Sequence, residues 1–264
     1  MTRIAEEFQV DLLVLAECGI SERRLWKALR SKDPRFDLPT NPHPRFRFFT
    51  RFPGVRLEPW LADDRIAVRR LKLDGCRDIL LAAIHYLDRR NHTPGKQYRE
   101  LAADRETLRE SEDRAQHSRT VLFGDLNMNP FDLGMLDPTH GLGAMMTRDL
   151  TRVHSREGRG PLRFYNPMWA AMGRSDAPGT FYWDADEPNN PYWNCLDGVL
   201  VRPALLDAFR DEDLRIIRRI DDGETDLIRL ADVHWKISYS DHLPILFKLD
   251  VPLTSPTGGE SEHG

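Results

Sequence analysis

The chain has 264 residues, of which 40% are hydrophobic and 30% charged, as is ordinary for a globular protein. Its formal net charge of −4 argues against tight, sequence-independent binding of nucleic acid through overall charge. No apolar run approaches the roughly 20 residues that cross a bilayer, and no basic, signal-like segment opens the sequence, so we expect a cytoplasmic protein without a membrane span.

The N-terminal part predicts a helix, a strand and a second helix. Val10–Ala16 is an almost continuous apolar run and predicts a buried strand. Ala5 and Phe8 suggest a short helix that leads into it. Ser21–Ser31 predicts a helix whose N-terminus Ser21 can cap.

The middle of the chain predicts a hairpin followed by a long helix. Ile66–Leu73 alternates apolar and polar residues, the period of a half-buried strand. Asp74 and Gly75 form a strong turn pair before the apolar run Ile79–Tyr86. Tyr98–Gln116 is rich in good helix formers, with leucines at near-heptad spacing.

The C-terminal half predicts further strands at Thr120–Gly124, Cys195–Val201 and Ile245–Leu249. The tail Val251–Gly264 is mainly proline, serine, glycine and glutamate, and we expect it to be disordered. We therefore expect one α+β domain over residues 1–250, with a two-sheet core and helices outside it.

Five of the predicted strands carry polar side chains at or beside an end. Each signal alone is weak, because an acid after an apolar run is most often a turn residue or a helix cap. The set, in its chain order, is more informative than any member. It consists of Glu17, His85, Asp125 with Asn127, Asp197, and Asp241 with His242.

In this order the motifs resemble those of the endonuclease/exonuclease/phosphatase superfamily, which has the DNase I-like fold. The resemblance covers roughly residues 5 to 249. It implies a four-layer α/β/β/α sandwich of two packed mixed β-sheets with outer helices. The matching segments are LVLAE at Glu17, IHYL at His85, GDLN at Asp125 and Asn127, LDGVLV at Asp197, and SDHLPI at Asp241 and His242.

The resemblance also implies a metal-dependent phosphoesterase, with Mg²⁺ or Mn²⁺ bound by Glu17 and Asp241. Hydrolysis of a phosphate ester needs negative charge to be offset in the transition state, and hard cations prefer carboxylate oxygens. Asp125 would take a proton from water, and Asn127 would hold the water or a phosphate oxygen.

The two histidines complete the implied catalytic group. His242 would contact the phosphate as a charged donor, and Asp197 would hydrogen-bond its other ring nitrogen. His85 would be a second donor to the phosphate. These roles are carried over from the resemblance.

The sequence departs from the family pattern at its start. Family members open with a strand that carries an Asn near the metal, ahead of the strand that ends in Glu. Only nine residues precede Val10, and none is Asn. We therefore expect the first strand to be missing, either because the true start lies upstream of Met1 or because the protein does without it.

Two segments bear on the substrate. Residues 148–163 contain five arginines, which form either a solvated loop or contacts to a phosphate backbone through Arg152, Arg156 and Arg159. The aromatic block Phe164–Trp193 either packs in the core, which we favour, or stacks on bases.

The expected function is hydrolysis of phosphodiester bonds, with DNA or RNA as the first substrate and no obligate protein partner. A phosphomonoesterase or phospholipase of the same fold is the nearest alternative, because substrate choice depends on the loops. A catalytically inactive binding or scaffold protein that lacks the first strand is the alternative from another class.

Overall fold

The computed structural model describes residues 1–251 except 76, 153–162, 175, 185–190, 222, 232–233 and 238–239, and for 228–231 and 234–237 it describes the backbone alone. Within these residues, no helix combines the length and apolar character that membrane crossing requires. The helices are α1 (Thr2–Glu7), α2 (Glu22–Lys32), α3 (Pro94–Ala115), α4 (Leu133–Leu136), α5 (Arg148–Arg152) and α6 (Met168–Ala171), with short 3-10 turns η1 (Gly54–Arg56), η2 (Pro203–Ala208) and η3 (Asp211–Asp213).

A seven-stranded mixed sheet forms the centre of the molecule, in the order β3-β4-β5-β6-β11-β8-β7. Its β5 and β6 pair in parallel, while β6 and β11 pair antiparallel. Its strands are β3 (Leu57–Ala62), β4 (Ile66–Leu71), β5 (Ile79–His85), β6 (Thr120–Asp125), β7 (Ala144–Met145), β8 (Phe164–Tyr165) and β11 (Asp197–Val201).

The remaining described strands form antiparallel pairs. The pairs β1–β2 and β12–β17 pack against one face of the large sheet. They are β1 (Leu12–Ala16) with β2 (Phe46–Thr50), β9 (Phe181–Tyr182) with β10 (Trp193–Asn194), β12 (Arg215–Ile216) with β17 (Ile245–Leu246), β13 (Arg219–Ile220) with β14 (Thr225–Asp226), and β15 (Ile228–Ala231) with β16 (His234–Ile237).

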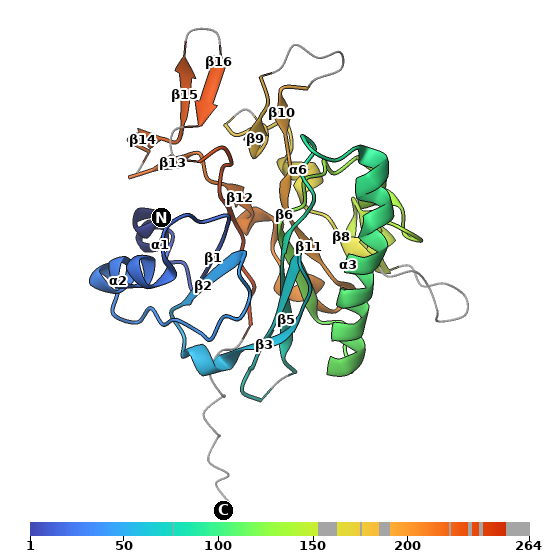
Figure 1. Cartoon of the computed structure of the whole chain (residues 1–264), viewed down its shortest axis with the longest axis horizontal. Coiled ribbons are helices and arrows are strands. Elements are labelled where there is room, and N and C mark those ends of the chain that lie inside the picture. The colour runs from blue at the N-terminus through green and yellow to red at the C-terminus, as the bar shows by residue number, and fades with distance from the viewer. Residues whose placement is uncertain are drawn as a thin grey trace, which may run out of the picture.

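The strand alternation divides the core into layers, which Figure 1 shows edge-on. Leu81 and Val121 of the large sheet point into the cluster shared with β2 and β12, whereas Leu80 and Leu122 point to the opposite face and pack on α3. On the outer side of β1, Leu13 packs against α2. The order of layers is therefore α1 and α2, small strand pairs, large sheet, α3, as expected for the DNase I-like sandwich.

The structure confirms the main predicted elements with shifted ends. The helix predicted from Ser21 is α2, and the long helix is α3, which begins four residues earlier than expected because Thr93 caps it and Pro94 stands in its first turn. The last strand, predicted over Ile245–Leu249, is only Ile245–Leu246 in the structure. The tail from residue 252 lies outside the described residues.

The expected absence of a first strand stays a prediction. Residues 2–7, which precede β1, form the helix α1. In the described part of the chain, β1 pairs only with β2.

Candidate active site

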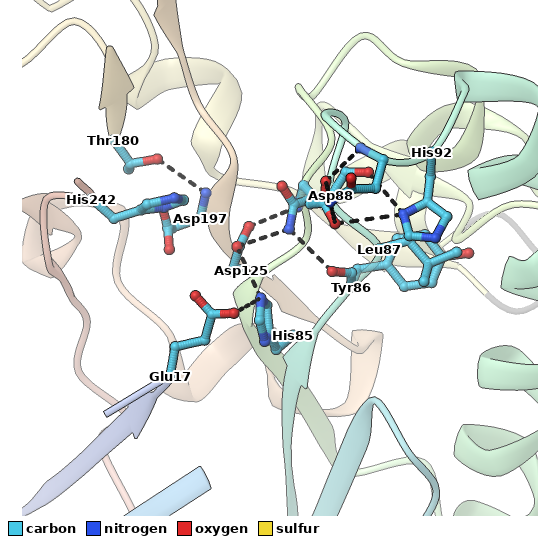
Figure 2. A network of polar contacts seen from close by, with 12 residues as sticks. Glu17, His85, Tyr86, Leu87, Asp88, His92, Asp125, Thr180, Asp197 and His242 are labelled. Carbon is cyan, nitrogen blue, oxygen red and sulfur yellow. Dashed lines mark hydrogen bonds and ion pairs between the residues drawn. The ribbon is translucent and has the colours of Figure 1, made fainter. Parts of the chain in front are cut away.

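Three predicted site residues lie side by side at one end of the large sheet. β5 ends at His85 and β6 ends at Asp125, and the two residues are partners in the parallel register. β11 begins at Asp197, which is the antiparallel partner of Asp125. Strand register alone therefore places one imidazole and two carboxyl groups on adjacent strands (Figure 2).

A glycine allows the close approach of these strand ends. Gly124 has a φ of +130°, and a Cβ at this position would lie 2.2 Å from the backbone oxygen of Ile84. No other residue type fits such a conformation and contact without a shift of the backbone. The glycine of the GDLN segment is thus needed to bring Asp125 beside His85.

Two site residues have left-handed backbone conformations. Glu17, directly after β1, has a φ of 48°, and Asn127 has a φ of 50°. This region is uncommon for residues other than glycine and is found preferentially at functional sites. The backbone oxygen of Asn127 accepts hydrogen bonds of 3.1 Å from Arg89 Nε and Gln97 Nε2, which hold the turn in place.

Asp125 is enclosed by its own turn. Its Oδ1 accepts a hydrogen bond of 2.8 Å from the backbone N–H of Asn127, and its Oδ2 accepts one of 2.9 Å from Asn127 Nδ2. Burial, together with the negative charge of Asp197, raises the pKa of Asp125 to about 7. This carboxyl can therefore take up or release a proton near neutral pH.

Asp197 and His242 form an oriented pair. His242 Nδ1 lies 2.7 Å from Asp197 Oδ2. Asp197 is held in turn by Thr180, whose Oγ1 accepts a hydrogen bond of 3.0 Å from the Asp197 backbone N–H. Burial opposes the charge on His242, but the hydrogen bond and negative charge of Asp197, with Asp125 and Asp241, outweigh it and raise the pKa of His242 to about 9. His242 is therefore a cation at neutral pH.

His85 lies between Glu17 and Asp125. Its Nε2 is 3.6 Å from Glu17 Oε1 and 3.7 Å from Asp125 Oδ2. Burial lowers the pKa of His85; the charge of Glu17 opposes this, and the charges of Arg45 and His242 add to it. The buried Nδ1 of His85 has no hydrogen-bond partner among the described residues.

Carboxylates gather where a divalent cation could bind. Asp125, Asp197 and His242 each offer a ligand atom, and these atoms lie within 4.8 Å of one another. His242 Nδ1 is bound to Asp197, which favours the protonated ring, so a metal at His242 would have to displace a proton that Asp197 stabilises. Glu17, the predicted ligand, is 77% exposed and its carboxylate points toward His85 and Asp125 (Figure 2). Asp241, the other predicted ligand, is exposed and directly precedes His242.

Of the three arginines predicted to bind the substrate, the structure describes one, Arg152. Arg152 ends α5 and forms an ion pair of 2.9 Å with the exposed Asp207. Arg156 and Arg159 lie outside the described residues. In the same segment, Arg148 pairs with Asp211 at 2.9 Å, which gives it a structural role.

Aromatic and cationic groups lie beside His242; the aromatic residues belong to the block noted in the sequence, whereas sequence reasoning missed Arg90. The Phe181 ring lies 4.8 Å from the His242 ring and 6.1 Å, stacked, from the Trp183 ring. The guanidinium of Arg90 lies over Trp183 at 5.0 Å. The preference for core packing of the aromatic block therefore fits Phe164 and Phe181, which are 1% and 8% exposed, but Phe181 also contacts the His242 ring of the candidate site. The only sequence signal for Arg90 was its position five residues after His85.

Comparison with known sequences gives one family. The model of the endonuclease/exonuclease/phosphatase family matches residues 2–242. No curated protein matches the chain.

Comparison with solved structures gives the same fold. A 3′ phosphatase, NExo, from Neisseria, solved with a product DNA hairpin, is similar with a TM-score of 0.53 and 15% identity, over 94% of this chain and 92% of that one. A 3′-5′ exonuclease, NExo, from Neisseria meningitidis gives a TM-score of 0.50 and 16% identity, over 91% and 90%. At these identities the likeness shows the fold alone.

Proposed function

Because the chain belongs to the endonuclease/exonuclease/phosphatase family, we propose that it is a divalent-metal-dependent hydrolase of phosphate esters in nucleic acid. The observation that carries this proposal is the pairing of a cationic His242 with Asp197, next to the carboxyl of Asp125, whose pKa is about 7. Such a set supplies both a proton acceptor and a positive charge for a phosphate group.

Asp125 is the proposed proton acceptor. With a pKa of about 7, it is substantially ionised at neutral pH and basic enough to accept a proton from water as the new P–O bond forms. Asn127 fixes the orientation of this carboxyl through two hydrogen bonds. A fixed base lowers the cost of arranging the water in the transition state.

The two histidines are the proposed phosphate contacts. His242 offers a charged N–H, and the bond from Nδ1 to Asp197 leaves Nε2 available for a phosphate oxygen. His85, whose pKa is lowered by burial, is mostly neutral and can donate a hydrogen bond from one ring nitrogen. Negative charge that develops on the phosphate is thus met by one cation and one neutral donor.

The proposed metal ligands are Glu17 and Asp241, with Mg²⁺ or Mn²⁺ as the ion. Both are exposed carboxylates: Glu17 Oε1 lies 3.6 Å from His85 Nε2, and Asp241 directly precedes His242 in the chain. Carboxylate oxygens are the donors that hard cations prefer. When bound, the ion would polarise a phosphoryl oxygen and stabilise the leaving group.

Nucleic acid is the proposed substrate class. Arg90 and Trp183 beside His242 match a phosphate-contacting cation next to an aromatic surface. The two similar structures belong to an exonuclease and to a 3′ phosphatase solved with DNA. We therefore place phosphodiester hydrolysis first and removal of a 3′-terminal phosphate second.

A substrate panel tests the proposal. Purified protein is incubated with Mg²⁺ or Mn²⁺ and with duplex DNA, single-stranded DNA, RNA, a 3′-phosphorylated oligonucleotide, and p-nitrophenyl phosphate. We expect turnover of a nucleic-acid substrate that EDTA abolishes and that a His242→Ala protein, purified identically, lacks. Turnover that persists in EDTA would contradict the metal-dependent mechanism, and turnover of p-nitrophenyl phosphate alone would contradict the substrate class.

A further inference from the structure

An arginine-lined cavity lies outside the candidate active site. It encloses about 410 Å³, within the range of roughly 300–1,000 Å³ typical of pockets for small organic ligands. Four arginines line it, together with one carboxylate. They are Arg174, Arg215, Arg218 and Arg219, with Asp176.

Two of the four arginines have carboxylate partners. Arg218 forms a salt bridge of 3.0 Å with Asp226 and donates a hydrogen bond of 2.8 Å to the backbone oxygen of Asp176. Arg219 lies 3.7 Å from the same Asp226 carboxylate. One carboxylate thus serves two guanidinium groups.

The other two arginines have no such partner. Among the described residues, no ion pair or side-chain hydrogen bond is formed by Arg174 or Arg215, and both are exposed. Among the described lining residues, four arginines stand against one aspartate, Asp176, so the lining carries an excess of positive charge. A concave site with this excess attracts anions.

The rest of the lining is apolar. Ala177, Ile216 and Ile217 are buried, and Phe8 at the end of α1 is partly buried against the same cluster. Free phosphate would leave this apolar surface uncovered. A ligand with an anionic group and a flat or apolar body matches both parts of the lining.

Two of the cavity's walls are close in the chain or by hydrogen bond to segments of the active site. Ala177 stands three residues before Thr180, which holds Asp197. On the other wall, the backbone N–H of Ile217 donates a hydrogen bond of 2.7 Å to the oxygen of Pro244, two residues after His242. Three residues of chain span at most about 11 Å, so Ala177 lies within that distance of Thr180.

We propose that this cavity binds a phosphate ester of mononucleotide size, with its phosphate on Arg174 and Arg215 and its base or sugar on the apolar wall. The nucleotide has two sources. It can be free in solution, or it can be one residue of a strand whose scissile phosphate lies at His242. The second source rests on the proposed function, and the first does not.

Calorimetric titration with adenosine monophosphate in EDTA tests the site without turnover. We expect binding to the wild type and, with similar affinity, to Asp197→Asn, because the cavity does not include the catalytic pair. Arg174→Ala/Arg215→Ala should weaken binding at least tenfold. The matched control Arg23→Ala/Arg24→Ala removes two exposed arginines from α2 and should leave the affinity unchanged. Unchanged affinity in the cavity variant, or no binding to the wild type, would overturn the proposal.

Two further titrations test the apolar wall. Inorganic phosphate should bind at least tenfold more weakly than adenosine monophosphate, and adenosine should bind more weakly still. If inorganic phosphate binds as tightly as the nucleotide, the assignment of the apolar wall to a base or sugar is wrong.

Kinetics distinguish the two sources. If the cavity holds part of the strand, Arg174→Ala/Arg215→Ala raises KM for an oligonucleotide but not for p-nitrophenyl phosphate. If the ligand is free nucleotide, oligonucleotide KM is unchanged while nucleotide affinity falls. If the protein has no nuclease activity, the kinetic comparison cannot be made, but the binding titrations still test the site. Failure of the proposed function and failure of this site can therefore be told apart.

Discussion

The carboxylate of Asp197 lies between two partners: it is 2.7 Å from Nδ1 of His242 and faces Asp125 as its cross-strand partner. At His242, Asp197 together with Asp125 and Asp241 outweighs burial and raises the pKa to about 9. At Asp125, burial is the larger cause and Asp197 adds to it, which raises the pKa to about 7. Between these values Asp125 is ionised while His242 keeps its proton. One carboxylate therefore supports a base and a cation in the same site.

This arrangement predicts a bell-shaped dependence of kcat/KM on pH. Activity should rise through about pH 7 as Asp125 loses its proton, and fall above about pH 9 as His242 loses its own. Asp197→Asn removes the negative charge that raises both pKa values, so both limbs should move to lower pH and kcat should fall.

The control is Asp207→Asn, which removes an exposed carboxylate paired with Arg152. Its pH profile should match the wild type. An alkaline limb that stays near pH 9 in Asp197→Asn would show that His242 titration does not govern that limb.

Metal binding should depend on Glu17 and Asp241. Glu17→Gln or Asp241→Asn removes an anionic oxygen ligand and should weaken Mn²⁺ affinity at least tenfold, the effect expected when a hard cation loses a charged ligand. Calorimetric titration of Mn²⁺ into metal-free protein measures this directly. Glu110→Gln, an exposed change on α3, serves as the control.

The same titration separates two possible ligand sets. Asp197→Asn should keep its Mn²⁺ affinity if Asp197 serves only His242. Loss of binding in Asp197→Asn, with Glu17→Gln unaffected, would move the metal to the Asp125, Asp197 and His242 group.

Gly124→Ala should destabilise the protein and disrupt the site. The new Cβ would lie 2.2 Å from the Ile84 oxygen at a φ of +130°, a clash and strain that we expect to cost about 3 kcal/mol. For a chain of this size that corresponds to a fall in Tm of roughly 6–12 °C. Thermal unfolding measures it.

Gly19→Ala is the matched control, because a Cβ there meets nothing within 4 Å and the residue also lies near Glu17. Its Tm should stay within about 2 °C of the wild type. Equal Tm values for the two alanine variants would contradict the close approach of β6 to β5.

The large sheet was predictable where strands are long and apolar. β5 is buried throughout and β6 over its first four residues, and the ends of both strands carry the polar residues that identified the site. β2 and β3 were missed: β2 is only five residues long and mixes Arg47 with phenylalanines, and β3 contains Pro59, which argues against a strand in sequence. Both owe their conformation to tertiary packing.

The candidate site was predictable only as far as motifs mark it. Glu17, His85, Asp125 and His242 stand in recognisable segments, and the structure brings them together. Thr180 does not stand in a recognisable segment. Its hydrogen bond to Asp197 depends on the fold, which brings together residues that are 17 apart in the chain. The protonation states of Asp125 and His242 depend on burial and on contact with Asp197. Neither burial nor this contact can be read from the sequence around a single residue.

The proposed nucleic-acid surface beside His242 includes Arg90. Arg90, held over Trp183 beside His242, is exposed and should contact a phosphate of the strand. Arg90→Ala should raise KM for a DNA oligonucleotide. It should also reduce the slope of log KM against log salt concentration by about 0.7–0.9, the change expected for one lost phosphate contact. It should leave p-nitrophenyl phosphate kinetics unchanged, because that ester offers no flanking phosphate.

Two other arginines serve as controls. Arg152→Ala should change the slope less, since Arg152 is already paired with Asp207. Arg109→Ala should not change it, since Arg109 is paired with Glu106 on α3. Arg156→Ala/Arg159→Ala, tested in parallel, examines the loop predicted from sequence to bind the backbone. A slope that is the same for Arg90→Ala and the wild type would remove Arg90 from the path of the strand, and a reduced slope only in Arg156→Ala/Arg159→Ala would place that path over the loop instead.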